Sequence, residues 1–169
     1  ILAKLSKEFG WPRSFNVDTG KSQPERLVEV ALTLGRRMVM GLSPQSLNDA
    51  TLTAISRTNL GGKNNRKLVY ELFKENNITS TAAIIVPLPK ETKESFVAGL
   101  KDLSDSHVEQ PLAYTTMLLK GTPLASKESR DSHKMETRYR LLPRQFGEYM
   151  GERIVEYDEV CIATDTMSH

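Results

Sequence analysis

The chain has 169 residues, 38% of them hydrophobic, and a formal net charge of +2 at pH 7, a composition typical of a globular protein with one hydrophobic core. No apolar run approaches the roughly 18 residues that a membrane-spanning helix needs, and no signal peptide is recognisable. Basic and acidic residues alternate without a block of one sign, which argues against a nucleic-acid or membrane partner, and we expect a cytoplasmic protein.

The residue types that build metal and phosphate sites are sparse. The single cysteine, Cys161, excludes an internal disulfide framework and any Cys-x-x-Cys site in this chain. His107, His133 and His169 lack the spacing of metal ligands, and we interpret them as surface residues. Gly61-Gly62 lacks the Lys-Ser/Thr of a phosphate-binding loop, so we interpret it as an ordinary loop.

Hydrophobic periodicity predicts strands that alternate with helices over the first 120 residues. The predicted helices cover residues 1–9, 22–34, 48–59, 68–76 and 92–103. We expect Gly10 to end the first helix, a capping box at Ser22 to begin the second, and Asn48 and Thr92 to cap the third and the fifth. The predicted strands cover residues 13–17, 38–42, 82–86 and 112–119. This alternation implies right-handed βαβ crossovers and therefore a parallel sheet.

The stretch from Met38 to Asn59 is the most informative part of the chain. Its strand is apolar on both faces, as in parallel strands that helices cover. Pro44 has no N–H for a ladder, so we expect pairing to end there and Gln45 and Ser46 to project at the carboxyl edge of the sheet. Parallel α/β folds bind ligands at that edge. The Gln45 amide both donates and accepts hydrogen bonds, so it can bind a cofactor, although it can equally satisfy its own turn.

The pattern is weaker after residue 121. A short charged helix is predicted over residues 127–134, a strand over 137–142 and a helix over 146–155. We expect residues 121–169 to form an irregular α+β extension.

Four segments carry a resemblance to one family. Gln45-Ser46, followed by a helix that ends in Arg57-x-Asn59, resembles the fifth barrel strand and next helix of radical S-adenosylmethionine (radical SAM) enzymes. Residues 84–92, IIVPLPKET, resemble the family's sixth-strand motif, in which Gly-Leu-Pro-Gly-Glu-Thr follows apolar residues; Pro87 and Lys90 replace the two glycines. Residues 121–124 and 154–160 are similar to the C-terminal extension of the branch that carries an N-terminal cobalamin-binding domain.

The resemblance implies a fold and a domain organisation. It implies an α/β fold in which residues 1–120 form the C-terminal half of a partial (β/α) TIM-type barrel and residues 121–169 form the extension. The chain begins without Met inside a helical pattern, so we expect a fragment of a longer protein that lacks its N-terminal half. That missing half is then its first partner.

The resemblance also implies cofactors. Such enzymes cleave S-adenosylmethionine with a [4Fe–4S] cluster, and the resulting 5′-deoxyadenosyl radical abstracts hydrogen from a small-molecule or modified substrate. Three thiolates, spaced as in Cys-x3-Cys-x2-Cys, hold that cluster, and one cysteine cannot replace them. We therefore expect the cluster ligands and a cobalamin domain to lie upstream, and the chain alone to be inactive.

We predict nine residues of a cofactor and substrate site in this chain. The cofactor-binding candidates are Gln45, Ser43, Ser46, Arg57, Leu88, Glu91 and Lys21, and the substrate-cavity candidates are Tyr114 and Thr116. Arg57 can hold the cofactor's carboxylate or lock the Gln45 loop, and we favour locking. Lys21 can instead be solvated, and Tyr114 and Thr116 can instead fill the barrel. We expect Asn59 to cap its helix and predict no catalytic residue in this chain.

Two other function classes stay open at this point. A degenerate, non-catalytic barrel half that serves as an interaction module would also explain the missing cysteines. A different βα-barrel enzyme using Glu91 or Lys21 as acid or base is the third interpretation.

Overall fold

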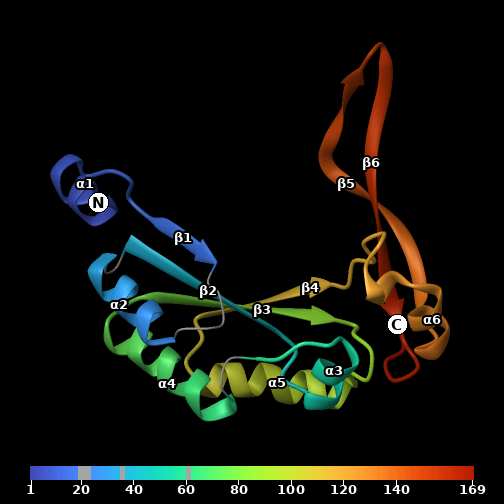
Figure 1. The fold of residues 1–169 in the computed structure, drawn as a ribbon, viewed down its shortest axis with the longest axis horizontal. Coiled ribbons are helices and arrows are strands. Elements are labelled where there is room, and N and C mark those ends of the chain that lie inside the picture. Colours follow the sequence, from blue (N-terminus) through green and yellow to red (C-terminus); the bar gives the residue numbers. More distant parts are fainter. Residues whose placement is uncertain (19–23, 35–36, 60–61) are drawn as a thin grey trace.

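A parallel β-sheet forms the centre of the first part of the chain (Figure 1). The computed structural model describes residues 1–18, 24–34, 37–59 and 62–169. Within these residues the sheet has the order β1-β2-β3-β4, and each neighbouring pair is parallel. The strands are β1 (Phe15–Asp18), β2 (Met38–Gln45), β3 (Thr79–Val86) and β4 (Gln110–Thr115).

Helices connect these strands and cover one face of the sheet. They are α2 (Pro24–Leu34), α3 (Asp49–Ala54), α4 (Gly62–Glu75) and α5 (Lys93–Asp105), whereas α1 (Leu2–Phe9) precedes β1. In Figure 1, α2, α3, α4 and α5 lie on the same side of the sheet. The predicted parallel α/β architecture is confirmed.

Short polar signals begin and end the helices as predicted. Gly10 ends α1 in the left-handed conformation, with φ of 65°. The Asn48 side chain caps α3 by accepting a hydrogen bond of 2.9 Å from the backbone two residues on. Thr92 begins α5 with a reciprocal capping box. The predicted capping box at Ser22 and the loop with Lys21 lie outside the described residues.

The hydrophobic core lies between the sheet and these helices. Its buried members are Ala31, Met38, Met40, Leu42, Val69, Tyr70, Phe73, Ile78, Ala82, Ile84, Leu103 and Val108. Helices do not cover the other face of the sheet in Figure 1, and every residue of β4 is exposed. Leu112 and Tyr114 keep 39% and 53% of their surface in solvent. The sheet therefore has one packed face and one open face.

The end of β2 differs from the prediction, because the strand continues through Pro44 to Gln45. Leu42 pairs with Ala82 and Gln45 pairs with Ile84, so three steps along β2 match two steps along β3. This register shift is a bulge, and a bulge tolerates a residue without an N–H. Pro44 thus bends the strand without ending it.

Residues 121–169 form an extension that pairs with the chain just after β4. Its elements are a 3-10 helix (Pro123–Ala125), α6 (Lys127–Ser132), β5 (Glu136–Tyr149) and β6 (Glu152–Ala163). Met117 and Val160 form an antiparallel bridge. The Cys161 N–H donates to the Thr116 carbonyl at 2.9 Å, and the Leu118 N–H donates to the Glu159 carbonyl at 2.9 Å. Backbone pairing therefore holds the extension against the carboxyl edge of the sheet.

The predicted short helix and strand at the start of the extension are confirmed, but the helix predicted over residues 146–155 is wrong. These residues form the tip of the β5–β6 hairpin. Tyr149 pairs with Glu152, and the two residues between them, Met150 and Gly151, have φ of 52° and 81°. Positive φ at both positions is the geometry of a two-residue hairpin turn.

The hairpin projects away from the sheet in Figure 1 and has one apolar face. Leu141 lies opposite Tyr157, and Phe146 lies opposite Val155. Side chains alternate along strands, so these four residues share a face with Tyr139, whose ring is 5.4 Å from that of Tyr157. All five are exposed, Phe146 to 76%. An isolated two-stranded ribbon of this kind is only marginally stable in water.

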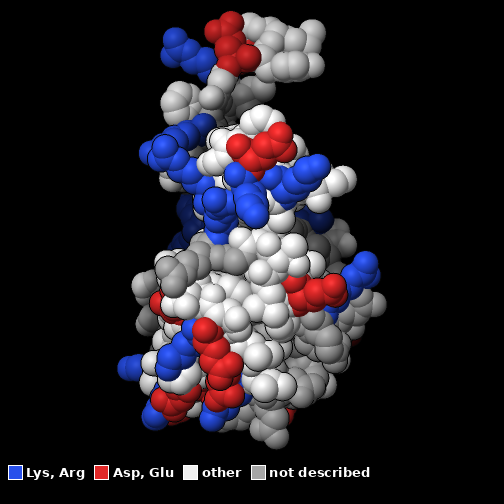
Figure 2. All heavy atoms as spheres, turned by 90° about the vertical axis from the view of Figure 1, so that its left-hand side faces the viewer, with Lys and Arg blue, Asp and Glu red and all other residues white. Residues whose placement is uncertain are grey.

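Charges of both signs share the face shown in Figure 2. Lys and Arg side chains gather across its upper half, and Asp and Glu side chains lie beside them. A cavity of about 440 Å³ beside α1 is lined in part by Lys4, Lys7 and Arg37.

No helix among the described residues combines the length and the apolarity needed to cross a membrane.

Candidate functional site

A cavity of about 1120 Å³ lies at the carboxyl edge of the sheet, between the ends of β2, β3 and β4 and the extension. The sheet contributes one wall, and the 3-10 helix, α6 and the base of β5 contribute the other. This is the edge at which parallel α/β folds place ligands.

The structure brings six of the nine predicted site residues to this cavity. They are Ser43, Gln45, Arg57, Leu88, Tyr114 and Thr116. Ser46 and Glu91 are buried beside the cavity and do not line it. Lys21 lies outside the described residues.

Gln45 occupies the bulge at the end of β2. Its φ is 64°, an uncommon conformation for a residue other than glycine. It still pairs with Ile84 of β3, so its backbone is held on one side by the ladder. Gln45 therefore lines the cavity from a constrained backbone.

Arg57 and Asn59 each hold one backbone carbonyl group near Gln45, one on either side of it in the sequence. Arg57 donates from Nη2 to the Ser43 carbonyl at 3.1 Å, and Asn59 donates from Nδ2 to the Ser46 carbonyl at 2.8 Å. The favoured locking contact of Arg57 is therefore present. The predicted cap role of Asn59 is wrong, because α3 already ends at Ala54. The Asn59 amide binds the loop after β2 instead.

Arg57 is desolvated on one side. Burial lowers the pKa of its guanidinium from the ordinary value. Its Nε is buried and has no hydrogen-bond partner among the described residues. A buried donor without an acceptor costs free energy, which an incoming polar group can offset.

Glu91 and Ser46 form a buried cluster behind the cavity wall. The Ser46 hydroxyl donates to one oxygen of the Glu91 carboxylate, and the Ser95 hydroxyl donates to the other. Glu91 is 2% exposed. These hydrogen bonds join the loop after β2 to the loop after β3.

The substrate-cavity candidates differ in their surroundings. Tyr114 lies half-exposed on the open face of β4. Thr116 is 1% exposed, and its hydroxyl donates to the Pro87 carbonyl. Thr116 therefore also ties the chain after β4 to the loop after β3, whereas the Tyr114 side chain has free room in the cavity.

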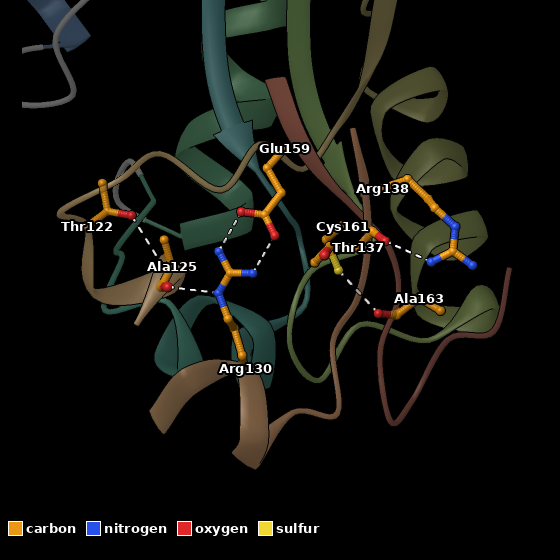
Figure 3. A network of polar contacts seen from close by, with 8 residues as sticks. All are labelled: Thr122, Ala125, Arg130, Thr137, Arg138, Glu159, Cys161 and Ala163. Carbon is orange, nitrogen blue, oxygen red and sulfur yellow. Dashed lines mark hydrogen bonds and ion pairs between the residues drawn. The ribbon is translucent and has the colours of Figure 1, made fainter. Parts of the chain in front are cut away.

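An ion pair fixes the extension wall of the cavity (Figure 3). Arg130 of α6 donates through Nη1 and Nη2 to the two carboxylate oxygens of Glu159 in β6, at 2.5 and 2.8 Å. Its Nε donates to the Ala125 carbonyl at 2.9 Å. The Arg130 guanidinium holds the pKa of Glu159 down from 4.5 to about 2.

Sequence reasoning missed this pair and misjudged one histidine. Arg130 and Glu159 lie 29 residues apart, and no local pattern links them. His133, interpreted as a surface residue, instead lines the cavity, and its Nδ1 is buried without a partner among the described residues. Its position after a short charged helix is the only sequence signal.

Two curated proteins are similar to this chain in sequence. The chain is 31% identical over 140 residues to a protein of Streptomyces tokunonensis named cobalamin-dependent radical SAM methyltransferase TokK. It is 29% identical over 140 residues to 2-(S-pantetheinyl)-carbapenam-3-carboxylate methyltransferase of Streptantibioticus cattleyicolor. Both alignments cover 80% of this chain and 20% of the relative.

The chain is related to the radical SAM enzymes. It spans about a fifth of the length of these two curated relatives. No family model matches it. Among solved structures it resembles coproporphyrinogen III oxidase (HemN) from Escherichia coli, a radical SAM enzyme, with a TM-score of 0.51 and 21% identity over 69% of this chain and 28% of that chain. The shared fold is that of a partial α/β barrel.

The residues of this cavity suit the S-adenosylmethionine of radical SAM enzymes. The ligand carries a ribose, an amine and a carboxylate, and the cavity offers neutral amide and hydroxyl groups from Gln45, Ser43 and Tyr114. The Arg57 guanidinium, with its unpartnered Nε, supplies positive charge at the same edge. Gln45, Ser43, Arg57 and Leu88 are the residues that would hold it.

The residues present do not fit the [4Fe–4S] cluster of radical SAM enzymes. The one cysteine, Cys161, is buried and donates from Sγ to the Ala163 carbonyl at 3.1 Å (Figure 3). Burial raises the pKa of its thiol, which disfavours the thiolate that binds metal. No group of three His, Cys, Asp or Glu in the described part of the chain can hold a metal ion.

Proposed function

We propose that this chain provides the cofactor- and substrate-lining part of a radical SAM enzyme, and that the complete protein carries out cobalamin-dependent methyl transfer. The observation that carries the proposal is the cavity at the carboxyl edge of the sheet, where six residues singled out from the sequence converge. The names of the two curated relatives support methyl transfer, and that of TokK supports cobalamin.

The cavity has two walls of different origin, and we assign them different roles. Bound S-adenosylmethionine would supply the radical that starts the reaction. The sheet wall, with Gln45 and Ser43, would bind and orient it, and Arg57 would hold the loop that presents them. The extension wall, with His133 and Arg140, would face the substrate. The Arg130–Glu159 pair would keep that second wall in place and limit the entry of water.

Under this proposal, other groups that the enzyme needs are supplied from outside this chain. Three cysteines for the cluster and a cobalamin domain would come from another part of the complete protein, and the chain alone would be inactive. A cytoplasmic location belongs to the same proposal, because reduced thiolates must be available for the cluster.

Anaerobic reconstitution of the complete protein with iron and sulfide tests the proposal. We expect a bound cluster, binding of S-adenosylmethionine by calorimetry, and 5′-deoxyadenosine in the presence of a reductant. The chain of 169 residues, treated in parallel, is the matched control and should give none of the cleavage product. A complete protein that carries no cluster and binds no S-adenosylmethionine would favour the interaction module instead.

A further inference from the structure

The buried cluster around Glu91 connects the two loops that edge the cavity. Glu91 follows β3 and precedes α5, whereas Ser46 follows β2, and Ser95 lies in the first turn of α5. Each carboxylate oxygen of Glu91 accepts a hydroxyl hydrogen bond, one from Ser46 and one from Ser95. The carboxylate is buried, so these donors compensate for the water that it has lost.

Each serine also accepts a backbone hydrogen bond. The Asn48 N–H donates to Ser46 Oγ at 3.0 Å, and the Thr92 N–H donates to Ser95 Oγ at 2.9 Å. A continuous chain of hydrogen bonds therefore runs from the start of α3 through Glu91 to the start of α5. Hydrogen bonds in such a chain polarise one another, and the backbone at both ends is fixed together.

One residue of the site with positive φ, Gln45, lies directly beside this chain of hydrogen bonds. Gln45 has φ of 64°, and a non-glycine residue keeps such a conformation only where its surroundings over-determine it. On its N-terminal side Arg57 holds the Ser43 carbonyl, and on its C-terminal side the Ser46 hydroxyl is held by Glu91. Neither Ser46 nor Glu91 lines the cavity.

We infer that Glu91 is a positioning residue, which acts through Ser46 to hold the Gln45 amide at the cavity and does not itself touch the ligand. The inference rests on the proposed function, in which the cavity binds S-adenosylmethionine. It assigns Glu91 a role different from the direct cofactor contact expected from the sequence. The tail after β6 supports the same loop, because Thr166 Oγ1 donates to the Glu91 carbonyl at 2.7 Å.

Ser46→Ala and Ser95→Ala form a matched pair for the test. Each change removes one hydroxyl from the same carboxylate, but only Ser46 adjoins Gln45. The measurement is the affinity of the complete protein for S-adenosylmethionine by calorimetry, with unfolding by urea alongside. We expect Ser46→Ala and Glu91→Gln each to weaken binding about fivefold, and Ser95→Ala to change it less than twofold even where it lowers stability.

Three further readouts separate positioning from a purely structural role. The double variant Ser46→Ala/Glu91→Gln should bind no more weakly than either single variant, because both changes break the same connection. In the reconstituted enzyme, KM for S-adenosylmethionine should rise about fivefold while kcat at saturation stays within twofold. Amide hydrogen exchange over residues 45–48 should be faster in Ser46→Ala and unchanged in Ser95→Ala.

The possible results separate this inference from the proposed function. A wild-type protein that binds no S-adenosylmethionine would overturn both. Normal wild-type binding with an unchanged affinity in Ser46→Ala would overturn only the positioning role. Equal losses of affinity in Ser46→Ala and Ser95→Ala, in proportion to their losses of stability, would also overturn it.

Discussion

Loss of the Arg130–Glu159 ion pair should loosen the extension wall of the cavity by a measurable amount. The informative change is Glu159→Gln, which keeps the size of the side chain and one acceptor oxygen but removes the charge. Glu159 is 17% exposed and Arg130 29% exposed, so the pair is partly desolvated. Its hydrogen bonds join α6 to β6 across 29 residues of chain.

The magnitude follows from the ionisation of Glu159. Its pKa is about 2 in the folded protein and 4.5 as an ordinary carboxyl. At about 1.4 kcal/mol per pKa unit, this difference corresponds to roughly 3 kcal/mol of favourable interaction with the carboxylate, to which Arg130 contributes most and the Thr137 side chain also contributes. Solvent screens part of that coupling, so we expect Glu159→Gln to lower the free energy of unfolding by roughly 1–2 kcal/mol at pH 7.

The pH dependence has a defined sign. Because the folded state holds the carboxylate at a lower pKa than the unfolded state, the stabilisation is fully present above about pH 4.5 and is lost as the pH falls toward 2. The difference between wild type and variant should therefore shrink over that range.

Urea unfolding of wild type and Glu159→Gln at several pH values between 2 and 7 measures this difference. Glu156→Gln, at an exposed position on the same strand, is the matched control and should cost less than about 0.5 kcal/mol. An equal loss in both variants, or a Glu159→Gln difference that does not change with pH, would show that the charged Glu159–Arg130 pair does not stabilise the fold.

Three other predictions concern the cofactor, the site and the exposed surfaces. Anaerobic reconstitution of this chain alone should leave no stoichiometric iron–sulfur cluster, and a cluster absorption band would contradict the assignment of its ligands to another part of the protein. Gln45→Ala in the complete protein should weaken S-adenosylmethionine binding by up to about 1.5 kcal/mol, and by more than the fivefold loss expected for Ser46→Ala; equal calorimetric affinities in wild type and Gln45→Ala would remove Gln45 from the site. The chain alone should be marginally stable and self-associate, because the sheet has an open face and the hairpin has an exposed apolar face. Phe146→Ser, on that apolar face, should reduce association in sedimentation experiments more than Tyr149→Ser, on the opposite face; equal effects would exclude the apolar face as the cause.

Several local features followed directly from neighbouring residues. Asn48 and Thr92 cap the helices that they were predicted to cap, and Gly10 ends the first helix, because each depends on groups within a few residues along the chain. The alternation of apolar strands and amphipathic helices specified the parallel α/β architecture in the same way. It also indicated the carboxyl edge as the place of the cavity.

The hairpin shows where a local pattern is ambiguous. Phe146, Tyr149, Met150 and Ile154 recur at a spacing that suits a helix, yet they lie in two strands and their turn. In the structure residues 146–149 pair with residues 152–155, in continuation of the pairing of residues 136–141 with residues 157–163. The pairing of β5 with β6 therefore decides that residues 146–155 form a hairpin. The periodicity of these residues alone does not show that pairing.

For residues 1–120, the sequence alone predicted the order of strands and helices, the caps at Gly10, Asn48 and Thr92, and the sheet edge that carries Gln45, because these features depend on local hydrogen bonds and on the direction of parallel strands. Only the tertiary structure decided that Glu91 faces Ser46 inside the wall, that Pro44 lies in a bulge, and that Arg130 pairs with Glu159. These contacts join residues that are distant in sequence or depend on strand register. Their geometry exists only after the sheet and the extension have packed together.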